Sequence, residues 1–167
     1  QSSLERIEVG GIEAYNPLVG DDRDKLVEAV AEASELCTAL PSFKLYDSGP
    51  ASVASLLGEG LSLKFNRSDL PCAVVYAAEN DSRAASRLLE ACLTYRPAGF
   101  DSRVCFSETV IAKMCSVVDD TARIRDEVLL TVTNGAPKAF LVEAFDRILI
   151  ESKTPPGFQR GLDRFDP

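Results

Sequence analysis

The sequence contains no histidine among its 167 residues. This absence excludes a Ser-His-Asp triad, a Cys-His pair and any histidine-ligated metal site built from this chain. Glycine-rich phosphate motifs are also missing, because neither G-x-G-x-x-G nor G-x-x-x-x-G-K-[ST] occurs. The closest stretches, Gly10-Gly11 and Asn134-Gly135, are typical of turns. The sequence therefore predicts no metal site and no glycine-rich phosphate-binding loop.

Positive charge is scarce as well. The chain has 18 Lys and Arg against 26 Asp and Glu, a formal net charge of −8. An acidic field repels phosphate backbones, so we expect no nucleic-acid partner. No apolar run approaches the roughly 18 residues of a transmembrane helix, and the N-terminus lacks the basic-then-apolar pattern of a signal peptide. We expect no membrane association.

The cysteines are odd in number, widely spaced and without a C-x-x-C pair: Cys37, Cys72, Cys92, Cys105 and Cys115. Most of them lie within apolar runs, which favours buried free thiols that behave as small hydrophobic residues. A disulfide framework or a zinc site is the alternative. Reduced thiols indicate a reducing compartment, either the cytoplasm or an organelle matrix.

Short apolar runs alternate with stretches of helical periodicity. Pro71–Ala78 is apolar throughout, as expected of a strand that is covered on both faces of a parallel sheet. The pattern predicts strands at Ile7–Tyr15 (or a hairpin there), Glu35–Leu40, Pro71–Ala78, Ser102–Phe106, Val128–Val132, Ala139–Glu143 and Arg147–Ile150. It predicts helices that begin at Asp21 and after Gly49-Pro50, a third over Arg83–Tyr95 capped by Asn80-Asp81-Ser82, and a helical stretch over Glu108–Cys115.

This succession predicts an α/β fold with a Rossmann-like, mostly parallel sheet flanked by helices. The strands that follow one another late in the chain indicate a short antiparallel extension at one sheet edge. With 46% hydrophobic residues, the chain can form one core. We expect one domain over residues 1–152 and an irregular exit segment over residues 153–167.

Polar residues follow three of the predicted strands, in Thr38–Ser42, Glu79–Ser82 and Ser107–Thr109. Ligands of open α/β sheets bind at the carboxyl ends of the strands, and a helix N-terminus there suits a phosphate or a carbonyl. Ordinary helix caps use the same residue types, so capping is the alternative. The Asn80 amide could donate to a substrate oxygen or cap the next helix.

Several stretches together resemble the mannitol dehydrogenase family, the long-chain, zinc-independent polyol dehydrogenases that include mannitol-1-phosphate enzymes. The family has a Thr-Ala turn after one strand, a Cys/Ala-Glu-Asn signature after the next and a later Phe-containing stretch. The matching segments, in the family's order over roughly residues 7–165, are Thr38–Ser42, Pro71–Asn80, Phe106–Met114, Leu141–Phe145 and Ile148–Glu151.

The resemblance implies a partial Rossmann domain that binds NAD or NADP, with a polyol as the substrate of the full-length protein. It implies that Thr38, Ala39, Leu40 and Glu79 lie near the cofactor. It also implies that Asn80 reaches the nicotinamide end of the cleft and supports the alcohol oxygen of the substrate. Hydride would pass between the nicotinamide and a polyol carbon.

The sequence also departs from the family's pattern. The first strand–helix–strand unit with its glycine-rich turn, and the helical region with the catalytic Lys, Asn and His, have no counterpart here. Lys113 does not match the catalytic lysine and is expected at the surface, or next to an anionic group. We expect an inactive isolated chain that is a fragment, half of a split protein or a degenerate relative.

Two other classes stay open. One is a non-catalytic Rossmann-like module that binds a protein partner, and the other is a Rossmann-like small-molecule transferase such as a methyltransferase. In each case the incomplete sheet should have an unpaired edge, which we expect missing segments or a partner chain to cover, because bare edges aggregate.

Overall fold

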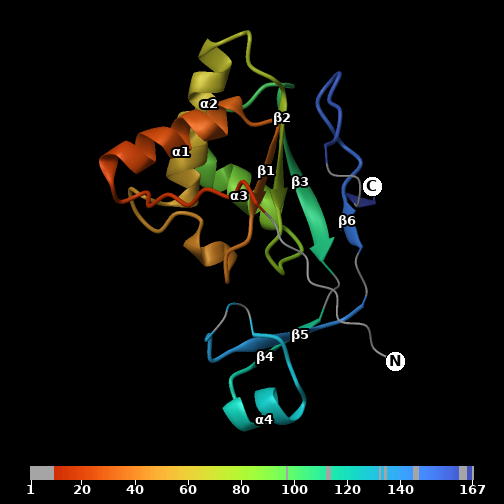
Figure 1. Ribbon diagram of the computed structural model, residues 1–167. Coiled ribbons are helices and arrows are strands. Elements are labelled where there is room, and N and C mark those ends of the chain that lie inside the picture. Colours follow the sequence, from red (N-terminus) through yellow and green to blue (C-terminus); the bar gives the residue numbers. More distant parts are fainter. Residues whose placement is uncertain are drawn as a thin grey trace.

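Two consecutive strand–helix–strand units form the main body of the molecule (Figure 1). The computed structural model describes residues 10–96, 98–111, 114–131, 133, 135–144, 147–161 and 165–166. The body contains α1 (Gly20–Glu32), β1 (Glu35–Thr38), the short 3-10 helix η1 (Phe43–Leu45), α2 (Val53–Asn66), β2 (Ala73–Ala77), α3 (Ala84–Leu93) and β3 (Val104–Ile111). Next come β4 (Cys115–Val118), α4 (Thr121–Asp126), β5 (Ala139–Val142), β6 (Ile148–Ile150) and β7 (Phe165–Asp166).

The main sheet has five strands in the order β1-β2-β3-β6-β7. The strands β1, β2 and β3 run parallel, β6 is antiparallel to β3, and β7 is parallel to β6. The predicted α/β fold with a mostly parallel sheet and short antiparallel strands near the C-terminus is therefore confirmed. Within the described residues, β1 pairs only with β2 and forms one edge of the sheet.

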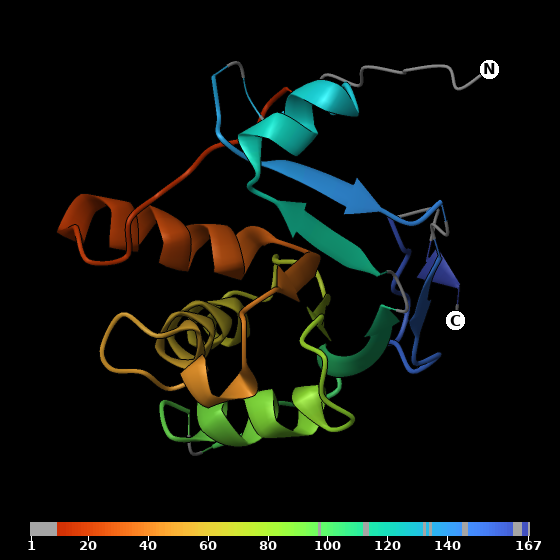
Figure 2. The same ribbon diagram turned by 90° about the horizontal axis from the view of Figure 1, so that it is seen from below.

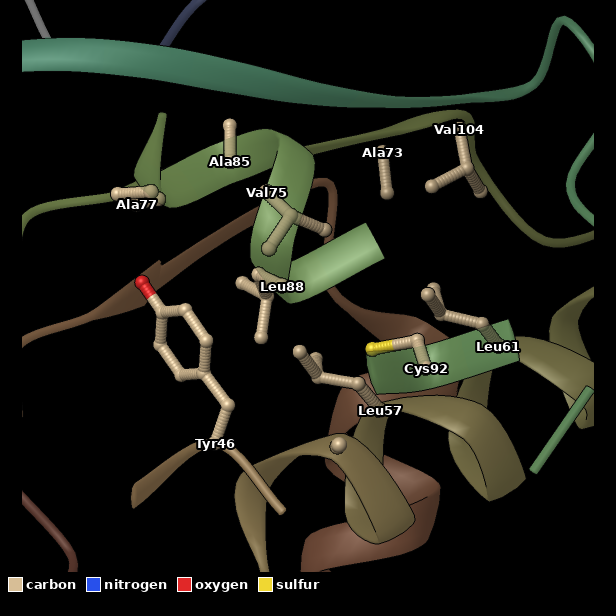
Figure 3. Close-up of a cluster of buried hydrophobic side chains, with 12 residues drawn as sticks. Tyr46, Leu57, Leu61, Ala73, Val75, Ala77, Ala85, Leu88, Cys92 and Val104 are labelled. Atoms are coloured by element: carbon tan, nitrogen blue, oxygen red, sulfur yellow. The ribbon is translucent and has the colours of Figure 1, made fainter. Parts of the chain in front are cut away.

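The helices α1, α2 and α3 lie on one face of this sheet (Figure 1). Alternate residues of β2 enter the core on that face, because successive side chains of a strand point to opposite sides. They pack against buried side chains from α2, α3 and the loop after η1 (Figure 3): Tyr46, Leu57, Leu61, Leu88 and Cys92. All five residues of β2 are buried, as the uninterrupted apolar run predicts.

The opposite face of the sheet is partly covered by an irregular segment and not by a helix. This segment spans residues 151–161. Phe158 packs there against a cluster that includes Val74 and Tyr76. Close to its end, the Gly161 N–H donates to Glu35 Oε2 at 2.9 Å, and the Tyr76 hydroxyl donates to the other oxygen of that carboxylate at 2.9 Å. The exit segment expected over residues 153–167 thus contacts β1 and includes the two residues of β7.

Helix α2 approaches α1 very closely at Gly60. A Cβ atom at this position would lie 2.5 Å from the Val30 side chain and 2.7 Å from the Val27 carbonyl oxygen. One turn further on, the fully buried Lys64 donates through Nζ to the Ala33 and Pro71 carbonyls at 2.9 and 2.8 Å. Burial lowers the pKa of this ammonium. The glycine sets the spacing of the two helices, and the lysine joins the end of α1 to the start of β2.

The remaining elements form a separate unit between β3 and β6. The strands β4 and β5 pair antiparallel with each other and, among the residues that the structure describes, with no strand of the main sheet. Figures 1 and 2 both show α4 beside this strand pair. Among the described residues, no helix is long and apolar enough to cross a membrane.

Two local predictions are wrong, and a third is wrong for the part of its range that the structure describes. The helix expected over Glu108–Cys115 does not form, because β3 pairs with β2 up to Glu108 and with β6 from there to Ile111, and β4 begins at Cys115. The strand expected over Val128–Val132 is reduced, within its described residues, to a single bridge at Thr131, since α4 ends immediately before it and Val128 has a positive φ of 52°. Residues 10–15 form no strand, and the rest of Ile7–Tyr15 lies outside the described residues.

Candidate functional site

The carboxyl ends of β1, β2 and β3 lie side by side at one edge of the sheet. Their parallel register places Thr38 beside Ala77 and Ala77 beside Glu108. The residues that follow each strand must then meet at the same place, which is where open α/β sheets bind ligands. The structure brings the polar residues after β1 and β2 into direct contact.

Glu79 is the centre of that contact. Its carboxylate is buried, with 5% of the residue exposed, and it accepts three hydrogen bonds. The Thr38 hydroxyl and the Leu40 N–H each donate at 2.8 Å, and the Tyr46 hydroxyl also donates. The carboxylate thereby joins β1, the loop after η1 and β2. Its oxygens are used inside the protein, so Glu79 holds the strand ends together and does not present a free charge to a ligand.

The environment of Tyr46 fits this arrangement. Burial raises the pKa of its phenol, and the hydrogen bond to Glu79 raises that pKa further. The phenol therefore stays protonated near neutral pH and acts as a donor. Thr38 is buried beside it. The hydrogen bonds of Thr38 and Tyr46 to Glu79 thus have a structural role at the ends of β1 and β2.

The N-terminus of α3 is capped from a distance. Glu108, on β3, accepts hydrogen bonds from the Ala85 N–H at 3.1 Å and the Ser86 N–H at 3.2 Å. The prediction that Asn80-Asp81-Ser82 caps this helix is therefore wrong for the Ala85 and Ser86 N–H groups. Asp81 instead accepts from the Arg83 N–H at 3.0 Å. The long-range cap forms because β3 is a strand at this position and directs Glu108 toward the helix.

A cavity of about 470 Å³ opens at the carboxyl ends of β2 and β3. Asn80 and Ser82 are exposed at its wall. The end of β3 also lines it, with Val110 56% and Ile111 43% exposed. The cavity thus combines hydrogen-bonding groups with apolar residues, a composition suited to an amide- or hydroxyl-bearing ligand.

The five predicted cofactor-site residues do not share one cavity. Thr38, Ala39 and Leu40 line a smaller and mainly apolar one of about 300 Å³, between β1 and the helices α1 and α2. Glu79 and Asn80 line the cavity at the ends of β2 and β3. Glu79 is the link between the two, since its carboxylate binds Thr38 and Leu40. Lys113 lies outside the described residues.

The sequence gives no sign of Tyr46 at this site, because it lies in a loop without periodicity and no pattern assigns it to a buried carboxylate. Glu108 and Thr109 belong to the polar run predicted at the third strand end, but the helix predicted from Glu108 onward gives them the wrong contacts. As part of β3, Thr109 instead donates through its hydroxyl to the Ala77 carbonyl at 2.7 Å and lines the cavity.

The carboxylates around the cavity are already engaged. Glu79 and Glu108 accept the hydrogen bonds described above, and Asp81 Oδ1 lies 3.2 Å from Arg87 Nε. Arg87 in turn stacks on the Phe43 ring at 3.9 Å. Within the described part of the chain, no group of His, Cys, Asp and Glu side chains could hold a metal ion, and the five cysteines are free thiols. The arrangement can bind and orient a ligand, and it offers no free carboxylate as a base.

Comparison with models of known protein families, and with curated proteins, finds no match for this chain.

Proposed function

We propose that this chain is the central part of a Rossmann-type domain from an NAD(P)-dependent polyol dehydrogenase. The observation that carries the proposal is the cavity at the carboxyl ends of two parallel strands, with the Asn80 side chain at its wall. This is the general position of ligands in open α/β sheets. The resemblance of Thr38–Ser42, Pro71–Asn80 and Phe106–Met114 to the mannitol dehydrogenase family supports the same conclusion.

The described residues suit the nicotinamide end of the cofactor. The Asn80 amide can both donate and accept, which matches a carboxamide or the oxygen of an alcohol. Val110 and Ile111, which point to opposite sides of β3, add exposed apolar residues to the lining. A bound nicotinamide would supply the hydride chemistry, and the Asn80 amide would help to position it.

The diphosphate of the cofactor does not fit the described part of this chain. The N-terminus of α3 already holds the Glu108 carboxylate, and the sequence has no glycine-rich turn. We therefore expect weak cofactor binding and no turnover of mannitol or fructose with NAD(P)H by these 167 residues alone. Measurable turnover by the isolated chain would contradict this expectation.

A titration with NADH, followed by amide signals in nuclear magnetic resonance spectra, tests the proposal. Signals of Asn80, Ser82 and Thr109 should shift together and saturate. Asn80→Ala should weaken binding about tenfold, the loss of one hydrogen bond of about 1–1.5 kcal/mol. Asn66→Ala, an exposed asparagine at the end of α2, is the matched control and should bind as the wild type does. An unchanged affinity in Asn80→Ala would refute the role of this amide.

One observation favours a second candidate, a non-catalytic module that binds a protein partner. Cys115 pairs with Val142 and Val117 with Phe140, so these four side chains share one face of the β4–β5 sheet. Val117 is 56%, Phe140 50% and Val142 52% exposed. Apolar faces of this kind mark interaction surfaces. An NADH titration that leaves the Asn80, Ser82 and Thr109 signals unmoved would favour this candidate.

A further inference from the structure

The backbone of β1 has hydrogen-bonding groups that no described strand uses. On its inner side, the Ser34 and Thr38 carbonyls accept hydrogen bonds of 3.0 Å from N–H groups of β2 and of the residue that follows it. Even-numbered residues of this stretch therefore bond to β2, and the N–H and C=O groups of Glu35 and Cys37 point to the outer side. Because β1 has no other partner among the described residues, these groups are available to one more strand.

Helix α1 lies over the position that one more strand would take. Helices α2 and α3 connect β1 to β2 and β2 to β3, so each covers its own pair of parallel strands. Helix α1 packs against α2 on the side away from α3, one place further out (Figure 2). Its only buried residue is Ala31, and the apolar side chains of Leu26 and Val30 stay partly exposed. The helix layer thus extends beyond the described sheet.

The cavity of about 300 Å³ lies between this edge and the helices. Val30 of α1 and Val53 and Leu56 of α2 line it together with β1 and the residues after it, and none of its lining residues is charged. We call the outer edge of β1 and this cavity the edge groove. A strand added to β1 would direct every second side chain to the helix side of the sheet, where the cavity can hold an apolar group. Peptide-binding sheet edges work in this way, with affinity from the backbone and specificity from pockets for alternate side chains.

The surroundings of the edge groove indicate what kind of segment fits it. Helix α1 carries five acidic and two basic side chains, and the whole chain has a formal net charge of −8. A segment with basic ends is complementary to this charge. A second copy of the chain does not fit, because pairing through its own β1 would bring its α1 into the layer that α1 and α2 already fill. An extended segment without a helix of its own meets no such obstacle.

We propose that the edge groove binds an extended segment of another polypeptide as an added strand. The segment has apolar side chains at alternate positions and basic residues at its ends. The strand β1 contains neither proline nor lysine, two residues that commonly protect an open edge, so the edge itself is left ready to pair. The inference goes beyond the proposed function, since the edge groove does not include the cavity lined by Asn80.

The test uses the peptide Lys-Val-Thr-Val-Thr-Val-Lys as the probe, since its valines lie on one side when it is extended. The readout is amide hydrogen exchange in the whole chain, followed by nuclear magnetic resonance. The peptide should bind saturably and slow the exchange of the Glu35 and Cys37 amide protons at least about tenfold. The Leu36 amide, which already faces β2, should change little. The reordered peptide Lys-Val-Val-Thr-Thr-Val-Lys and a version with glutamate ends should each bind at least about tenfold more weakly.

Two pairs of variants locate the binding to the edge groove. Cys37→Pro removes an outward N–H and leaves the bonds to β2 in place, as edge strands allow, and it should weaken peptide binding at least about tenfold. Cys37→Val keeps that N–H and should bind as the wild type does. Should the proline variant fail to fold, Leu56→Asp decides, because it places a charge in the cavity and should weaken binding to the same degree. Leu63→Asp, at an exposed leucine of the same helix outside the cavity, is its control.

Three results would overturn the inference. The first is the absence of saturable binding of the alternating peptide, and the second is equal binding of the alternating and reordered peptides. The third is slow exchange of the Glu35 and Cys37 amide protons without any peptide, because the chain itself or a second copy would then cover the edge.

Discussion

Replacing Glu79 by alanine is the sharpest test of how the strand ends are held together. The change leaves the Thr38 and Tyr46 hydroxyls without their acceptor in a buried site, and it frees the Leu40 N–H. An unsatisfied buried donor costs about 1–3 kcal/mol, so the two hydroxyls alone account for about 2–6 kcal/mol. Removing a buried charge recovers part of its desolvation cost. We expect a net loss of about 3 kcal/mol in the free energy of unfolding.

The assay is urea unfolding, followed by circular dichroism. With an m value of about 2 kcal/mol per molar urea, the midpoint should fall by about 1.5 M. Glu79→Gln keeps one acceptor oxygen, and the hydroxyls can reorient toward its amide, so it should lose only about 1–2 kcal/mol. Asn80→Ala, at the adjacent exposed residue, should stay within about 0.5 kcal/mol of the wild type. A Glu79→Ala variant within about 1 kcal/mol of the wild type would refute the reasoning.

Two further predictions concern packing and pH. Gly60→Ala should lower the free energy of unfolding by about 1–3 kcal/mol, because its Cβ would meet the Val27 carbonyl of α1. Gly20 has open space around it, so Gly20→Ala is the control and should not destabilise the protein. Equal effects of the two substitutions on urea unfolding would contradict the close approach of α1 and α2 at Gly60. The pKa of Tyr46 is raised in the folded state, so its contribution to stability is complete below the unfolded value of about 10 and is lost as the pH rises above it. Between about pH 9 and about pH 11, the free energy of unfolding of Tyr46→Phe should therefore fall less steeply than that of the wild type, by up to about 1.4 kcal/mol per pH unit. If the free energies of the two proteins fall in parallel over this range, the phenol is not buried as described.

The central sheet could be predicted because its signal is local. The apolar run around Val74 and Val75 corresponds to a fully buried strand, and the helical stripe at Leu88 and Cys92 faces the core. Where the pattern was ambiguous, tertiary partners decided. Thr109-Val110-Ile111 carries β-branched side chains and pairs with β6 beyond the end of the β2 ladder at Glu108, so it extends a strand and not a helix.

The candidate site could be predicted only in outline. Parallel strands place their carboxyl ends together, and this was enough to expect Thr38 and Glu79 near each other. The sequence has no signal that Glu79 turns back to Tyr46, because that contact joins a strand end to an aperiodic loop. The Glu108 cap was equally hidden, since it depends on the register between β2 and β3 rather than on a capping motif beside α3.

The unequal burial along the main sheet has a consequence for local opening. The parallel strands share the main core with α2 and α3, around Val75 and Leu88. The strands β6 and β7 have three and two residues, and Ile150 of β6 belongs to a smaller cluster with Val74 and Tyr76. Regions with few buried apolar contacts open first, so β6, β7 and the segment over Tyr76 should exchange their amide protons before the parallel strands do.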